Sequence, residues 1–113
     1  MFTLEEARAM LPRVQAITEE SHAQVEVLRE ELEAATDAVV RRRLEQRLNA
    51  TVQDWARRLM RLGVEVKGLW VADWDSGDGY YWCWQLGEET VEYFHRYEDG
   101  FAGRKPTKNL MGR

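Results

Sequence analysis

The sequence predicts an α+β fold, in which a long antiparallel helical hairpin with a short N-terminal helix is packed at its base by a three-stranded antiparallel sheet. Between residues 14 and 62, apolar side chains recur at steps of three and four, the period of an α-helix. After Gly63 the pattern changes to alternating aromatic and β-branched residues, which is typical of strands. The 113 residues suit one domain. We expect it to span residues 1–104, with a flexible tail over 105–113.

The helix boundaries follow from capping and proline. Thr3 followed by Glu6 has the spacing of a capping box, so a short helix is expected over residues 4–10. Pro12 has no N–H to donate and disfavours a helical Leu11, so the helix is expected to break there. A second helix then spans residues 12–35. A third spans residues 37–62, and Gly63 suits the left-handed residue that follows a helix.

The second and third helices are expected to pair as an antiparallel coiled coil. Facing residues in such a hairpin have numbers with a nearly constant sum, and the apolar stripes meet this condition. The facing pairs include Leu28 with Leu44, Val25 with Leu48, and Ile17 with Trp55. Residues 12–36 carry two basic and six acidic side chains, whereas residues 37–63 carry seven basic and three acidic ones. Flanks of opposite charge therefore lie side by side, and the turn falls at Thr36-Asp37.

Three strands are expected, over residues 69–74, 80–86 and 90–97, joined by turn-forming segments. If Gly87 and Glu88 form a two-residue turn, Trp84 faces Val91 and Trp82 faces Tyr93. In this register His95 and Cys83 lie on opposite faces of the sheet. A three-residue turn would flip the third strand relative to the second, so both registers stay open.

The composition of the chain argues against a membrane or nucleic-acid partner. The chain has one cysteine, so it can form no intrachain disulfide, and its opening segment is acidic where a secretory signal is basic. No apolar stretch has membrane length. We therefore expect a cytoplasmic protein without a membrane partner. The net charge of −4 argues against nucleic-acid binding. The arginine stripe considered for such binding is Arg43, Arg47, Arg57 and Arg61.

Three segments near the C-terminus carry a recognisable signature. It comprises Cys83-Trp84-Gln85-Leu86-Gly87-Glu88, Tyr93-Phe94-His95 and Asp99-Gly100-Phe101-Ala102-Gly103-Arg104-Lys105-Pro106. These runs, with Phe2-Thr3-Leu4-Glu5-Glu6-Ala7 and Leu11-Pro12, resemble a prokaryotic family known as domain of unknown function 2203. The family usually has glutamine where Lys105 stands. The resemblance implies no activity.

Few residues suggest chemistry. Asp73, Asp75 and Asp78 hint at a calcium loop, but their spacing is wrong and a polar hairpin turn is expected. Because Cys83 and His95 are placed on opposite faces, we expect no metal site, no catalytic residue and no cofactor.

The best ligand candidate is the glycine-rich segment around Arg104, where backbone N–H groups and a guanidinium could hold an anionic small molecule. The competing interpretation is structural, with Arg104 paired to Glu98 or Asp99. The candidate ligand-binding residues are Trp84, Tyr93, His95, Asp99, Gly100, Phe101, Gly103 and Arg104.

The leading hypothesis for function is a non-catalytic interaction or scaffold protein that forms a homodimer through its hairpin. Helices of two dozen residues reach about 36 Å, whereas strands of seven residues reach about 23 Å. The outer hairpin would therefore stay uncovered unless a second copy completed a four-helix bundle. Its exposed seam would carry Val25, Leu28, Leu32, Val40, Leu44 and Leu48. The alternative is an anionic-ligand binder or enzyme with a pocket between the sheet and the hairpin base, lined by Trp84, Tyr93, His95 and Arg104.

Overall fold

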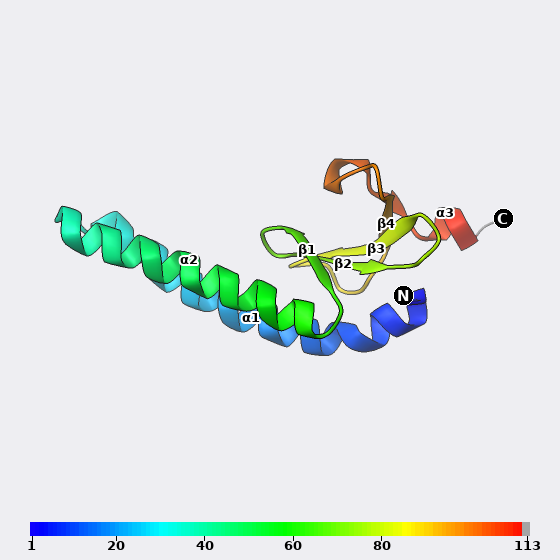
Figure 1. The fold of residues 1–113 in the computed structure, drawn as a ribbon, viewed down its shortest axis with the longest axis horizontal. Helices are drawn as coiled ribbons and strands as arrows, with labels where there is room; N and C mark the ends of the chain where they lie inside the picture. Colours follow the sequence, from blue (N-terminus) through cyan, green and yellow to red (C-terminus); the bar gives the residue numbers. More distant parts are fainter. Residues whose placement is uncertain (112–113) are drawn as a thin grey trace.

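The computed structural model describes residues 1–111 and is elongated, measuring 58 × 24 × 21 Å. Two long helices form a hairpin, and a five-stranded antiparallel sheet lies against its base (Figure 1). The helices are α1 (Leu4–Ala34), α2 (Ala38–Arg61) and the short α3 (Lys108–Met111). The strands are β1 (Glu65–Gly68), β2 (Val71–Asp75), β3 (Tyr80–Gln85), β4 (Tyr93–Arg96) and β5 (Lys105–Pro106), with a 3₁₀ turn η1 (Phe101–Gly103) before β5. None of the described helices is long and apolar enough to cross a membrane.

Helix α1 begins where the capping box predicts, but it does not break at Pro12. Thr3 Oγ1 accepts the N–H of Glu6, and the Glu6 carboxylate accepts the N–H of Thr3. The expected separate helix over residues 4–10 is wrong, because the helix runs through Pro12 to Ala34. Pro12 lies on the exposed side, where the carbonyl that loses its partner can meet water. The opposite side packs continuously on the sheet, which favours one helix.

The predicted hairpin is confirmed, and a contact between its helices agrees with the expected register to within one residue. Asp37 caps α2 by accepting the N–H of Val40, so the turn lies where the sequence placed it. Trp55 donates its indole N–H to Thr18 Oγ1 at 2.9 Å, beside the expected partner Ile17. Trp55 and Ile17 are both buried in the main core. Gly63 follows α2 with φ +82°, as a left-handed residue should.

The sheet has five strands in the order β1-β2-β3-β4-β5, where the sequence predicted three. Strand β1 lies before the expected first strand, because Leu69 and Trp70 form a tight turn between Gly68 and Val71. Trp70 therefore leaves the sheet with φ +62° and packs its ring against Trp55. The predicted flexible tail is also wrong for its described part, since β5 pairs with β4 and α3 follows it. Residues 112 and 113 of that tail lie outside the described residues.

The pairing of β4 differs by one residue from the expected register. Trp82 faces Phe94 and Cys83 faces Tyr93, because β3 and β4 are joined by a longer loop and not by a two-residue turn. In this loop Glu88 donates its N–H to the carbonyl of Gln85, and Gly87 has φ +106°. This one-residue shift moves each side chain of β4 to the face of the sheet opposite to the expected one.

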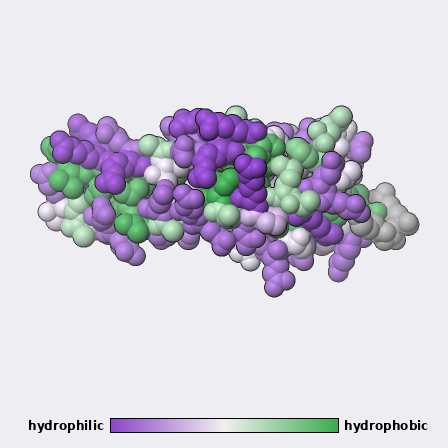
Figure 2. All heavy atoms as spheres, turned by 90° about the horizontal axis from the view of Figure 1, so that it is seen from below, coloured by the Kyte–Doolittle hydropathy of each residue, from purple (hydrophilic) through white to green (hydrophobic). Residues whose placement is uncertain are grey.

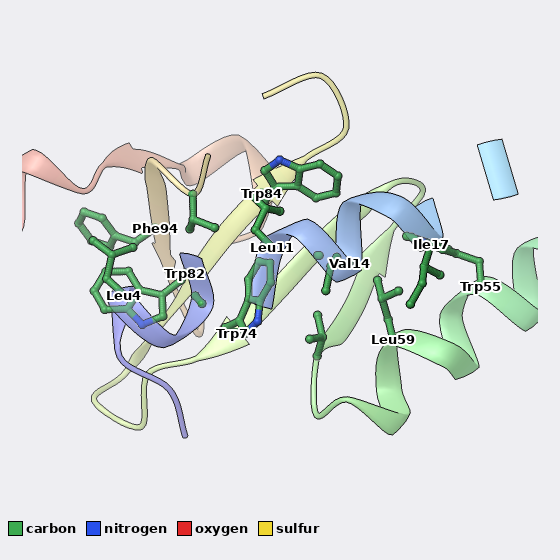
Figure 3. Packing of buried hydrophobic residues seen from close by; sticks show 14 residues of the cluster. Leu4, Leu11, Val14, Ile17, Trp55, Leu59, Trp74, Trp82, Trp84 and Phe94 are labelled. Carbon is green, nitrogen blue, oxygen red and sulfur yellow. The ribbon is translucent and has the colours of Figure 1, made fainter. Parts of the chain in front are cut away.

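One face of the sheet forms the core with the helices. Figure 3 shows tryptophans of β2 and β3 meeting leucines and valine of α1, while Trp55 and Leu59 of α2 close the cluster. The N-terminus is held there too, because Trp82 donates its indole N–H to the carbonyl of Phe2. The space between the sheet and the hairpin base is therefore filled by side chains. The opposite face, called the outer face below, carries Asp73, Tyr81, Cys83, Tyr93 and His95.

Candidate functional site

The segment after β4 brings Arg104 over the outer face, where its guanidinium is already paired. Nη2 of Arg104 donates to both carboxylate oxygens of Glu88 at 2.7 Å. The guanidinium lies over the rings of Tyr93 and Phe101, at 4.1 and 4.4 Å from their centres. The sequence pointed to Glu98 or Asp99 as the structural partner, which is wrong. Because β5 pairs with β4, the side chain reaches back to the β3–β4 loop.

The predicted ligand-binding residues separate into two groups. His95, Asp99 and Gly103 line a cleft of about 420 Å³ beside α3, which Arg96 and Lys105 also line. Gly103 suits this place because an added Cβ would lie 2.8 Å from the Cβ of Asp99.

The other predicted residues do not line this cleft. Trp84 is fully buried in the core and donates its indole N–H to the carbonyl of Glu88 at 2.9 Å. Tyr93 is half-buried beneath Arg104. Gly100 and Phe101 are exposed at the start of η1. The expected pocket lined jointly by Trp84, Tyr93, His95 and Arg104 is not formed.

The corrected register of β4 instead assembles a buried cluster on the outer face. Asp73 of β2, Cys83 of β3 and His95 of β4 place one ligand-type atom each within 4.8 Å of one another. Their exposed fractions are 1, 0 and 3 %. Cys83 lies on the middle strand, and its small side chain lets Asp73 and His95 meet above it. The expectation that Cys83 and His95 lie on opposite faces is wrong.

The hydrogen bonds of His95 indicate which ring nitrogen carries a proton. Nδ1 lies 3.1 Å from the carbonyl oxygen of Arg96, which can only accept, so Nδ1 carries a proton. Nε2 lies 3.0 Å from Oδ2 of Asp73. A bare lone pair facing a carboxylate would be repulsive, so a cation, either a proton or a metal ion, must join these atoms. The other carboxylate oxygen, Oδ1, is buried without a hydrogen-bond partner among residues 1–111.

Cys83 is not arranged as a nucleophile. Burial, followed by the charge of Asp73, raises the pKa of its thiol. Both ring nitrogens of His95 are already engaged, so neither is free to take the thiol proton. A cysteine–histidine catalytic pair needs a depressed thiol pKa and an available imidazole, and this site offers neither.

Asp73 is the member of this cluster that the sequence does not predict as a site residue. It was considered only for a calcium loop, whereas it lies inside β2, between Ala72 and Trp74. The loop after it is the expected polar turn, because Asp75 accepts the N–H of Gly77 and the hydroxyl of Tyr97. The available signal is an acid in the middle of an apolar strand. The structure places this acid directly opposite Cys83.

The family described as "Uncharacterized conserved protein (DUF2203)" matches residues 1–107. The match covers both helices of the hairpin and all five strands. No curated protein and no solved structure matches the chain.

Proposed function

Because this chain belongs to the DUF2203 family, whose description names no activity, we propose a function from its geometry: it is a non-catalytic interaction protein that forms a homodimer through its helical arm. The helical arm is the outer part of the hairpin, residues 23–50, which extends away from the sheet (Figure 1). The lone, buried cysteine suits action in the reducing cytoplasm.

The observation that carries this proposal is the unpaired charge of the helical arm. The α1 side is acidic and the α2 side is rich in arginine. Among the described residues, the one ion pair within 4 Å that joins α1 to α2 is Arg58 with Glu20, which lies outside the arm. Arg41 bonds instead to the carbonyls of Leu32 and Ala35. A second copy, related by a two-fold axis, would lay its acidic α1 along the basic α2.

Exposed apolar side chains along the arm add to this surface. Val27, Val39 and Val40 are 55, 59 and 45 % exposed. Figure 2 shows hydrophobic atoms among hydrophilic ones at the tip end of the hairpin. The expected seam is only partly open, because Val25, Leu28 and Leu44 are buried within one chain, whereas Leu32 and Leu48 are half-buried and Val40 is exposed. The proposed contact therefore uses the three exposed valines and the charged flanks, and not the buried seam residues Val25, Leu28 and Leu44.

The filled core gives this proposal further support. A pocket between the sheet and the hairpin base would favour a ligand binder or an enzyme, but tryptophans and leucines occupy that space. The anionic-ligand alternative also loses its main group, since Arg104 already holds Glu88. No observation favours it over the interaction protein.

A charge-swap experiment tests the dimer. One variant carries Arg43→Glu and Arg47→Glu, and a second carries Glu30→Arg and Glu33→Arg. In a two-fold contact between α1 and α2, each variant repels its own copy, whereas their mixture restores opposite charges. Sedimentation should show a dimer for the wild type, a monomer for each variant alone, and a dimer for the mixture of the two variants.

The matched control is Arg57→Glu, because Arg57 is exposed, lies outside the arm and pairs with Asp54 on its own helix. This variant should remain dimeric. Raised salt should weaken the wild-type dimer, since exposed charges are screened over roughly 10 Å at 0.1 M salt. A wild-type protein that sediments as a monomer at every accessible concentration would contradict the proposal.

A further inference from the structure

We propose that Asp73, Cys83 and His95 form a metal site that binds one divalent transition-metal ion of the zinc type. The three side chains come from adjacent strands and place their ligand atoms within 4.8 Å of one another. Sulfur, imidazole nitrogen and carboxylate oxygen are the donors that zinc takes in proteins. Calcium and magnesium take oxygen ligands, so this donor set selects against them.

The unpartnered oxygen of Asp73 points to a missing ligand. Oδ1 is buried and accepts no hydrogen bond from an N–H or O–H group of the described residues, although Asp73 is only 1 % exposed. Only the weak thiol donor of Cys83 faces this carboxylate. Leaving a buried carboxylate oxygen unsatisfied is costly, and native structures seldom do so without a bound ion or water. A metal ion held by this carboxylate would supply the absent partner.

The orientation of His95 also fits a metal ligand. Its Nδ1 donates to the backbone carbonyl of Arg96 at 3.1 Å, which leaves Nε2 directed toward Asp73. Metal-binding histidines commonly donate their second ring N–H to a carbonyl in this way. A proton between Nε2 and Oδ2 would satisfy those two atoms and leave Oδ1 with only the weak thiol donor of Cys83. A metal ion would engage the thiol and the carboxylate together with the ring.

The available space suits an ion of this size. With zinc–ligand bonds of about 2.0–2.3 Å, two ligands of one tetrahedral ion lie roughly 3.3–3.7 Å apart. Nε2 lies 3.0 Å from Oδ2, so the Asp73 carboxylate would turn to bring Oδ1 to the ion while the sulfur closes in. Three ligands from the chain leave the fourth position for water. All three side chains are buried, so the ion would enter during folding and would link β2, β3 and β4.

Refolding with and without metal tests the site. The purified chain is unfolded in denaturant with a chelator, then refolded with Zn²⁺, with Co²⁺, or without metal. We expect one ion per chain, a thiolate-to-cobalt charge-transfer absorption in the Co²⁺ sample, and a Tm several degrees higher in the Zn²⁺ sample. Equal Tm values in all samples and no cobalt absorption would overturn the proposal. The cluster would then be an Asp73–His95 ion pair above a buried thiol.

Variants assign the ligands. Cys83→Ser should abolish the charge-transfer band, and Asp73→Asn should weaken cobalt binding by more than the roughly 10–100-fold cost of losing an outer partner. His22→Gln is the matched control, because His22 is half-exposed on α1 and pairs with Glu26. It should bind cobalt as wild type does. If the ligand variants fail to fold, refolding of the wild-type chain with and without metal still tests the metal site. Full cobalt absorption in a folded Cys83→Ser variant would contradict the assignment of Cys83 as a ligand.

Discussion

At the residue scale, Arg104 belongs to a glycine-rich motif that suggests ligand binding, but in the structure it pairs with Glu88 and packs against two aromatic rings. Its side chain is 10 % exposed, and Glu88, which it holds, is 21 % exposed. We expect Arg104→Ala to lower the free energy of unfolding by about 1–3 kcal/mol, because a largely buried carboxylate would lose its partner. Arg104→Lys should recover only part of this loss, since lysine lacks the planar fork that stacks between the two rings. Urea unfolding measures both changes.

The matched control for Arg104 is Arg96→Ala. Arg96 is exposed on β4, and its replacement should change stability by no more than about 0.5 kcal/mol. Phosphate should leave the Tm of wild type and of Arg104→Ala equally unaffected. If phosphate stabilised wild type but not the variant, while their stabilities without phosphate were equal, Arg104 would be a ligand-binding residue instead.

Asp75 gives a prediction for pH. Its hydrogen bond from Tyr97, and then the bond from the N–H of Gly77, hold the pKa of this carboxyl below its ordinary value of 3.8. A lowered pKa in the folded state stabilises the fold above the ordinary pKa, and this contribution is lost as the pH falls through the folded value. Tyr97→Phe should therefore raise the pKa of Asp75 in an NMR titration. The stability difference between variant and wild type should shrink on acidification, and an unchanged pKa would contradict the bond.

Pro12 provides the prediction at the scale of elements. It stands inside α1, where it gives no N–H to the carbonyl of Arg8, and its own side chain is exposed. Pro12→Ala would restore that helical bond without disturbing the buried side of the helix. We expect the free energy of unfolding to rise by up to about 3 kcal/mol, the difference between alanine and proline in a helix interior. Ala16→Gly, at an exposed site one turn later, should lower it by about 1 kcal/mol.

Thermal unfolding with circular dichroism measures both helix variants. If Pro12→Ala lowered stability, the proline would be fixing a bend that the sheet contact requires. Continuous packing of α1 on the sheet would then not be the reason why the helix tolerates Pro12.

The elements that could be predicted are those whose signals are local and repeated. The hairpin follows from periodic stripes, the caps Thr3 and Asp37, and the sum of facing residue numbers, and each of these holds in the structure. The break at Pro12 was wrong because tertiary packing outweighed a local cost. Strands β1 and β5 were missed because they are short, and because β1 is set by the Leu69-Trp70 turn, which carries no glycine.

The candidate site was less predictable than the fold because it depends on register. One extra residue in the β3–β4 loop decides whether His95 joins Cys83 or faces away from it. The sequence left both turn lengths open, since Gly87 fits either. Arg104 was recognised, but its partner lies in that same loop, far from it along the chain. Distant pairing of this kind leaves no local signal.

At the scale of the whole molecule, the two ends of the protein have separate cores. The main cluster draws on residues 4–17 of α1 and on residues 55–94 of α2 and the strands, and it includes nothing from the helical arm. Val25, Leu28 and Leu44 pack inside the arm. The arm can therefore change without rearranging the sheet, and this separation suits an arm that serves for contact with a partner.

Shortening the arm tests this separation together with the proposed dimer. Removing residues 27–33 and 40–46 takes about two turns from each helix and keeps the facing pairs in register. Val27, Val40 and the arginines from Arg41 to Arg43 are lost, whereas every residue of the main cluster remains. We expect the shortened chain to keep the near-ultraviolet circular dichroism of its buried tryptophans. Its dimer should dissociate at least tenfold more readily, which corresponds to about 1.4 kcal/mol. A shortened chain with wild-type dimer affinity would place the interface on the sheet, and loss of the tryptophan signal would mean that the two cores are coupled.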